Sequence, residues 1–178
     1  MKQVLVSITA VVYIHGQYGS PSESEHYKSI FPGCEVIGLD YKTFAPRETG
    51  KEIHNFVEKL KSKYENIILI ANSIGAFFSM NADLEGLIQK AYFISPIVSL
   101  EGFVCDQPEW MNLQEPNWNL PTAILYGSHD NMTSFETISK FAKEHGADLT
   151  IMDGGEHWFH TEDQMQFLDD WIRRDGWI

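Results

Sequence analysis

The sequence predicts an α/β protein whose sheet is mostly parallel and carries helices on both faces. Short apolar segments rich in Val, Ile and Tyr alternate along the chain with longer segments of helical periodicity. The segment 67–70 is apolar at every position, which is typical of a strand buried on both faces of a parallel sheet. Strands that alternate with helices in this way form parallel sheets with helical layers on either side.

The chain begins with a predicted strand region and a predicted helix. Residues 4–14 are rich in strand formers and are long enough for one or two strands. A glycine-rich turn follows, and residues 22–31 are then expected to form a helix that Pro32 and Gly33 end. Ser22 is the expected N-cap, with Glu25 at the spacing of a capping box.

Periodicity also predicts the elements that lead to the centre of the sheet. Residues 35–39 form a short expected strand. Residues 47–64 form an expected helix, because its apolar side chains recur at the spacing of one helical face, namely Ile53, Phe56, Val57 and Leu60. The central strand follows and ends at a serine within a run of small residues.

The second half of the chain continues the alternation of strands and helices. A helix is expected directly after Ser73, running to about Met80, with a further short helix at 84–90. The remaining expected elements are strands at 91–95, 122–126 and 148–152 and helices at 133–145 and 161–173. No repeat or low-complexity linker interrupts the pattern, so a single domain covering 1–178 is expected.

The segment 97–120 has no clear periodicity and is interpreted as a short cap or lid insertion. Its aromatic and apolar side chains are candidates for lining an acyl pocket; these are Phe103, Trp110, Met111 and Trp118. The alternative is a loop whose aromatic side chains cover the edge of the sheet. An insertion this short predicts a small or open pocket, which fits a short acyl ester better than a long lipid.

Composition limits the class of partner. The chain has 13 basic and 25 acidic residues and a formal net charge of −12, which disfavours binding to nucleic acid or to an anionic membrane. The two cysteines are too few for a disulfide framework. The apolar run at 4–14 favours strand over signal peptide and has no small-residue cleavage site before His15, so a cytoplasmic location is expected.

Three loops that follow predicted strands carry the residues of a nucleophilic site. Ser73 lies in a small-x-Ser-x-Gly segment, which alone is either a nucleophile elbow or a tight turn with an N-capping serine. Asp130 and His157 follow in that order after two later strands. A serine nucleophile needs a base to take its proton and a third group to orient the base, and these three residues supply that set.

These motifs resemble those of α/β-hydrolase-fold serine hydrolases over nearly the whole chain. The matching segments are 15–17, 71–75, 127–130 and 154–157. The short length is similar to small members grouped near the retinoblastoma-binding serine hydrolases. The elbow departs from the family pattern in having Ala71 where its first glycine would stand.

The resemblance implies a role for each residue of the site. Ser73 is the expected nucleophile, His157 the base and Asp130 the carboxylate that orients it, while the backbone N–H groups of Ile74 and Gln17 form the oxyanion hole.

Several neighbouring residues leave alternatives open. His160 is a rival for the base, and His15 is either a pocket residue or a turn residue. His129 is expected at the pocket rim or the surface. A metal site on His157 and His160 lacks a third ligand at fitting spacing, so no metal or cofactor is expected.

The predicted function is hydrolysis of a small carboxylic ester through an acyl-enzyme intermediate. The same residues would serve a thioesterase, an amidase or an acyltransferase, and the sequence does not choose among them. A non-catalytic protein that binds a small ligand on the same scaffold is the alternative from another class. In either case the expected partner is a small molecule, with neither nucleic acid nor membrane, and the sequence does not indicate an oligomeric state.

Overall fold

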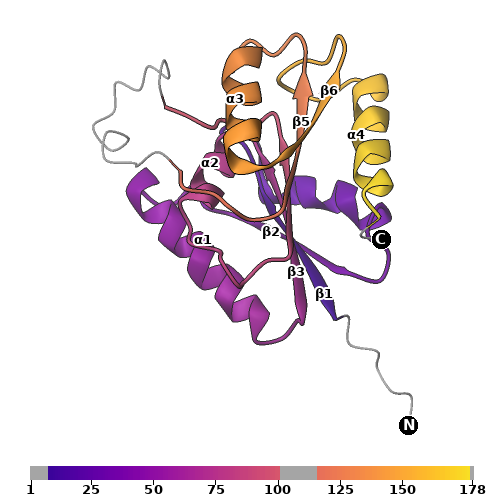
Figure 1. The fold of residues 1–178 in the computed structure, drawn as a ribbon. Coiled ribbons are helices and arrows are strands. Elements are labelled where there is room, and N and C mark those ends of the chain that lie inside the picture. Colours follow the sequence, from indigo (N-terminus) through magenta and orange to yellow (C-terminus); the bar gives the residue numbers. More distant parts are fainter. Residues whose placement is uncertain (1–7, 101–115, 177–178) are drawn as a thin grey trace.

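The computed structural model describes residues 8–100 and 116–176, which form one six-stranded sheet (Figure 1). Every neighbouring pair of strands is parallel, in the order β2-β1-β3-β4-β5-β6. The strands are β1 (Thr9–Ile14), β2 (Glu35–Leu39), β3 (Asn66–Asn72), β4 (Lys90–Ile94), β5 (Thr122–Gly127) and β6 (Asp148–Met152). The helices are η1 (Pro21–Ser29, a 3-10 helix), α1 (Pro46–Lys61), α2 (Ile74–Met80), α3 (Phe135–His145) and α4 (Glu162–Arg174).

The sheet separates two hydrophobic clusters, and strand periodicity assigns each side chain to one of them. In β3, Ile67 and Leu69 belong to one cluster and Ile68 and Ile70 to the other, because successive side chains of a strand point to opposite faces. Helices α1, α2 and α3 cover the first face, whereas η1 and α4 cover the second (Figure 1). The predicted parallel sheet with helices on both faces is confirmed.

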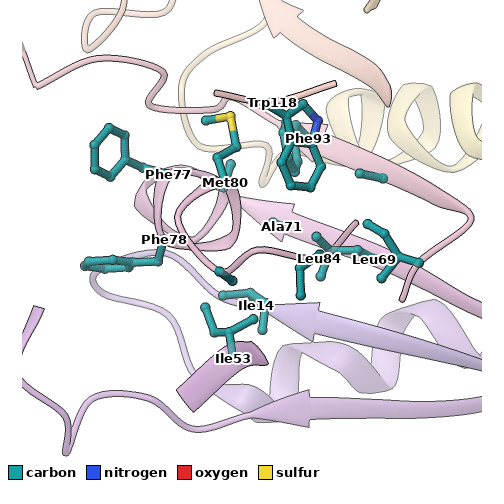
Figure 2. Packing of buried hydrophobic residues seen from close by; sticks show 14 of the residues in the cluster. Ile14, Ile53, Leu69, Ala71, Phe77, Phe78, Met80, Leu84, Phe93 and Trp118 are labelled. Atoms are coloured by element: carbon teal, nitrogen blue, oxygen red, sulfur yellow. The ribbon is translucent and has the colours of Figure 1, made fainter. Parts of the chain in front are cut away.

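Helix α2 contributes several bulky side chains to the first cluster. Figure 2 shows Phe77, Phe78 and Met80 around the short helix, beside Leu69 and Phe93 from the neighbouring strands. All seven residues of α2 are buried. A helix this short gains little from its own hydrogen bonds, so its stability comes from this packing.

The predicted helix at 22–31 begins earlier and is a 3-10 helix. Pro21 occupies its first position, where the fixed φ of proline suits a helix start and its missing N–H costs nothing. The backbone N–H of Ser20 donates to Glu23 Oε1 at 2.9 Å. Ser20 and Glu23 therefore occupy the positions at the helix start that are predicted for Ser22 and Glu25.

The predicted helix at 84–90 is wrong. Residues 84–88 make only a turn, in which the N–H of Leu87 donates to Leu84 O at 3.0 Å. Gly86 has a φ of 75°, which ends helical geometry. The N–H of Gln89 then donates to Ile67 O at 2.9 Å, so the chain already enters the sheet ahead of β4.

The order of the strands places a switch point between β1 and β3. The chain leaves β1 through η1 on one face of the sheet, and it leaves β3 through α2 on the other face. Ligands of open parallel sheets bind at such a point, beyond the carboxyl ends of the strands. Among residues 8–100 and 116–176, no helix has the length and apolar character needed to cross a membrane.

Candidate active site

Ser73 is held at the end of β3 in an unusual backbone conformation. Its φ is 54° and its ψ is −120°, a combination that costs a non-glycine residue about 1–3 kcal/mol unless its surroundings hold it. The last residue of β4 and the loop after it supply that support through two backbone hydrogen bonds. The Ser73 N–H donates to Ile94 O at 3.0 Å, and the Ser73 carbonyl accepts from the Ile97 N–H at 3.1 Å.

Glycine is required at position 75, two residues after Ser73, because the backbone of α2 lies against the backbone at the end of β1. A Cβ on Gly75 would lie 2.5 Å from His15 O and 2.6 Å from Ile14 O, and these distances are too short for any residue with a side chain. Ala71, by contrast, is fully buried in the sheet with its methyl group in the first cluster. The elbow therefore needs glycine at its last position and accepts alanine at its first.

Three side chains from separate loops form the Ser73–His157–Asp130 hydrogen-bond chain. Ser73 Oγ lies 2.8 Å from His157 Nε2, and His157 Nδ1 lies 2.8 Å from Asp130 Oδ2. The Asp130 side chain is fully buried, and its Oδ1 accepts the N–H groups of Met132 at 2.7 Å and Thr133 at 3.0 Å. These bonds hold the carboxylate in one orientation.

The chain of bonds also selects the tautomer of His157. An ionised carboxylate only accepts hydrogen bonds, so Nδ1 carries the proton and donates it to Asp130. The lone pair of Nε2 is then free to accept the hydroxyl proton of Ser73. The arrangement can therefore deprotonate Ser73 as its oxygen attacks an electrophile.

Direct contact between two glycine turns brings Asp130 and His157 together. A Cβ on Gly127 would lie 2.2 Å from Gly155 O, so no larger residue fits between the loops after β5 and β6. The N–H of His129 donates to that same Gly155 oxygen at 2.8 Å. The side chain of His129 is exposed, and it is the backbone N–H of this residue that joins the two loops.

His160 does not occupy the position of the base. Its ring stacks on Trp158 with centroids 4.0 Å apart, and its Nδ1–H donates to the Trp158 carbonyl at 2.7 Å. Among the described residues, the side-chain hydroxyl of Ser73 is hydrogen-bonded to His157 and not to His160.

Gln164 in the first turn of α4 bridges the two ends of the segment that carries His157. Its side-chain amide donates to Glu156 Oε2 at 2.9 Å and accepts the backbone N–H of His160 at 3.3 Å. Gln164 is buried, and Thr161 Oγ1 accepts its backbone N–H at 3.3 Å. No sequence motif points to Gln164, because a position in an amphipathic helix does not indicate which loop residues its side chain will contact.

We expect Gln164→Leu to lower kcat for ester hydrolysis about tenfold while changing KM by less than about twofold. The substitution removes the bridge and leaves the His160 N–H without its partner, so His157 is held less rigidly. Loss of these buried bonds should also cost about 1–2 kcal/mol of stability. Steady-state kinetics and thermal unfolding measure both effects.

The matched control is Gln166→Leu, because Gln166 is exposed on the same helix and bonds only Asp170 among the described residues. We expect this variant to keep normal kcat. A Gln164→Leu protein with normal kcat would show that the bridge does not position the base.

Gln17 and Ile74 line a single cleft beside Ser73. The cleft has a volume of about 390 Å³ and runs along the loop between β2 and α1. The backbone N–H groups of Gln17 and Ile74 donate to no described residue. The residues that line it are Gln17, Tyr41, Lys42, Thr43, Phe44, Ala45, Pro46, Thr49, Ile74 and Phe78.

Two predicted pocket residues belong to the core instead. His15 is fully buried, donates from Nδ1 to Gly16 O at 2.7 Å and stacks on Tyr41 with centroids 4.3 Å apart. Trp118 is 3% exposed, and its indole N–H donates to Thr122 Oγ1 at 2.7 Å. Neither ring has a surface open to a substrate, because each packs against the strand or loop next to it.

The other pocket candidates, Phe103, Trp110 and Met111, lie outside the described residues, as does most of the predicted cap. At the described ends of that segment, Ile97 and Val98 are buried in the first cluster. The described part of the chain contains no group of three or more His, Cys, Asp or Glu side chains that could hold a metal ion.

Solved structures with the same architecture extend over almost the whole chain. Est1E from Butyrivibrio proteoclasticus covers 96% of this chain and 87% of its own, with a TM-score of 0.73 and 16% identity. MGS-MChE2, an α/β-hydrolase enzyme from a sediment metagenome of the Mar Chica lagoon, covers 95% and 92% with a TM-score of 0.72 and 22% identity. The esterase Est2 from Thermogutta terrifontis covers 96% and 84% with a TM-score of 0.67 and 19% identity.

Sequence comparison gives a more limited likeness. A curated Mycoplasma genitalium protein with the provisional name esterase/lipase 3 is 30% identical over 88 residues, which is 48% of this chain and 32% of that protein. The matched stretch thus spans about a third of the relative's length. No family model matches the sequence. The sheet order, the helical layers and the structural neighbours together show that this chain has the α/β-hydrolase fold.

Proposed function

We propose that this protein hydrolyses small carboxylic esters through an acyl-enzyme formed on Ser73. The observation that carries the proposal is the Ser73–His157–Asp130 hydrogen-bond chain, with both bonds at 2.8 Å. Its three residues come from loops after β3, β5 and β6, where ligands of parallel sheets bind. A serine in a strained turn beside a correctly protonated histidine is an activated nucleophile.

Acylation begins with proton transfer from Ser73 Oγ to His157 Nε2. The oxygen attacks the ester carbonyl, and the negative charge that develops on the carbonyl oxygen is stabilised by the N–H groups of Ile74 and Gln17. Asp130 stabilises the imidazolium that forms and holds the ring in place. His157 then gives its proton to the departing alkoxide, leaving the acyl group on Ser73.

Deacylation repeats these steps with water as the nucleophile. His157 Nε2 takes a proton from the water, whose oxygen attacks the acyl carbon of the Ser73 ester. The same two N–H groups stabilise the second oxyanion, and the proton returns to Ser73 Oγ as the carboxylic acid leaves. No step requires a metal or a cofactor.

The similar solved proteins support this proposal. Est2 from Thermogutta terrifontis is an esterase whose structure was determined with butyrate bound, a short carboxylic acid. A further structure of that esterase is phosphorylated by paraoxon. Both observations suit a small acyl group and a nucleophile that reacts with organophosphates. A closer likeness to the retinoblastoma-binding serine hydrolases stays a prediction based on motifs and chain length.

A fluorophosphonate probe tests the proposal. We expect one equivalent to react with Ser73, to be located there by peptide mass spectrometry, and to abolish hydrolysis of p-nitrophenyl butyrate. Ser73→Ala should take up no probe, whereas Ser62→Ala, which changes an exposed serine at the end of α1, should react normally.

Failure of the intact protein to react, together with no turnover of esters, would favour the alternative of a non-catalytic binding protein. A panel of thioesters and amides with the same butyryl group separates ester hydrolysis from the related activities.

A further inference from the structure

This inference rests on the proposed function and concerns the part of the ester that enters the cleft lined by Gln17 and Ile74. Both residues supply the N–H groups that would hold the carbonyl oxygen, so the reacting carbonyl lies at the mouth of this cleft. His157 and Asp130 do not line the cleft. The two sides of the scissile bond therefore face different surroundings.

The transfer of a proton from His157 to the leaving group determines whether the alcohol or the acyl part of the ester enters the cleft. The departing alkoxide must lie within hydrogen-bond reach of His157 Nε2 to receive this proton, so the alcohol part of the ester lies on the histidine side. The acyl chain extends from the other side of the carbonyl carbon. It therefore enters the cleft along the loop between β2 and α1, whose volume of about 390 Å³ is that of a small-molecule site.

The walls of the cleft are mainly apolar. Phe44 and Phe78 line it together with Tyr41, whose ring packs on Phe78 with centroids 5.4 Å apart. The Tyr41 hydroxyl donates to His15 O at 2.6 Å, and burial, with a further contribution from Tyr13 and Glu23, raises its pKa so that it stays protonated. The hydroxyl of Thr49 likewise donates to Ala45 O. Neither hydroxyl needs a partner from a ligand.

Lys42 is the single charged residue among those that line the cleft. Its ammonium group has no carboxylate within 4.0 Å among the described residues, although its backbone N–H donates to Asp40 Oδ1 at 3.2 Å. The protein as a whole carries a net charge of −12, but at physiological salt charges beyond about 8 Å are largely screened. Lys42 thus supplies the charge within the lining that a ligand in the cleft meets directly, and the Asp40 carboxylate lies next to it in the same loop.

We propose that the cleft binds the acyl chain and that Lys42 makes the protein prefer acyl groups that end in a carboxylate. The substrate class is then the half-esters of dicarboxylic acids. Ser73 Oγ bonds to the esterified carbonyl carbon, the bond from that carbon to the alcohol oxygen breaks, and the alcohol leaves with the proton from His157. Water cleaves the acyl-enzyme to a free dicarboxylic acid and restores Ser73.

The test compares two fluorogenic esters whose acyl chains have equal length, 4-methylumbelliferyl adipate half-ester and 4-methylumbelliferyl hexanoate. The readout is the ratio of their kcat/KM values, adipate over hexanoate, because this ratio cancels any general loss of folded protein. We expect Lys42→Gln to lower the ratio about fivefold, as for loss of one partly solvated ion pair, and Lys42→Glu to lower it further. Lys51→Gln, which removes an exposed lysine of α1 outside the cleft, should leave the ratio unchanged.

A second variant tests the acyl assignment without using charge. Ala45→Leu places a larger side chain in the cleft and should lower kcat/KM for 4-methylumbelliferyl hexanoate at least about fivefold more than kcat/KM for 4-methylumbelliferyl acetate, which has a short acyl chain. For esters that differ in the length of the alcohol and share one acyl group, the ratio of kcat/KM values should be the same in the wild-type protein and in Ala45→Leu.

The outcomes separate this inference from the proposed function. If Ser73 reacts with the fluorophosphonate and both esters are cleaved, but the Lys42 variants keep the wild-type ratio, the carboxylate preference is overturned while ester hydrolysis stands. If Ala45→Leu changes the alcohol preference and not the acyl preference, the cleft binds the alcohol. If neither these esters nor p-nitrophenyl butyrate is cleaved and Ser73 takes up no fluorophosphonate, both the inference and the proposed function are overturned.

Discussion

His157→Gln is expected to lower kcat/KM for p-nitrophenyl butyrate by at least about 10⁴-fold. His157 Nε2 lies 2.8 Å from Ser73 Oγ, and without the imidazole no described group is bonded to that hydroxyl to take its proton. The side chain is 19% exposed and glutamine is of similar size, so the fold should persist. Initial rates on purified protein measure the loss, with circular dichroism to verify folding.

The neighbouring histidine provides the matched control for this result. His160→Gln should keep kcat/KM within about threefold of the wild-type value, because its ring stacks on Trp158 and its Nδ1–H is bonded to the Trp158 carbonyl. The opposite pattern, an inactive His160→Gln and an active His157→Gln, would assign the base to His160. Such a result would require the loop after β6 to rearrange when substrate binds.

Asp130→Asn is expected to lower kcat by about 10⁴-fold while the protein stays folded. The amide oxygen of asparagine can keep accepting the N–H groups of Met132 and Thr133, which leaves the amide NH₂ facing His157. Nδ1 of His157 must then accept a hydrogen bond, so the proton moves to Nε2. In that tautomer Nε2 has no lone pair for the proton of Ser73.

Single-turnover acylation, followed by release of p-nitrophenol, measures the effect of Asp130→Asn on the step in which Ser73 attacks. Asp153→Asn is the matched control, because Asp153 is exposed at the same edge and accepts a hydrogen bond from Ser128. We expect the control to acylate at the wild-type rate. An Asp130→Asn protein that retains a tenth of the wild-type rate would show that the carboxylate has little part in orienting the base.

The sequence predicted the sheet well because strand formation here depends on local apolar runs. The strands at 35–39 and 148–152 have the predicted bounds, and the apolar segment 67–70 lies within β3. Helices were less reliable where a single backbone feature decides their extent. Gly86 at a φ of 75° prevents the short helix predicted at 84–90, and Pro21 moves the start of the first one.

Within the site, the residues of the motifs were easier to predict than the residues of the pocket. The three residues of the hydrogen-bond chain lie directly after strands, so their meeting at one sheet edge follows from parallel topology. The aromatic residues of a long aperiodic segment carry no such constraint. Trp118 is predicted to line the pocket, but its indole N–H donates to Thr122 and its ring packs against Phe93 in the core.

By itself, the sequence determined the parallel sheet, the position of Ser73 at the end of its central strand and the order in which Asp130 and His157 follow. Apolar periodicity and chain order encode these features, since both act over short stretches or along the chain. The tertiary structure alone decided that His157 rather than His160 bonds Ser73, that Gln164 braces its loop and that Tyr41 and Lys42 line the cleft. Those features depend on how loops distant in sequence pack against one another, and no local pattern of residue types specifies such packing.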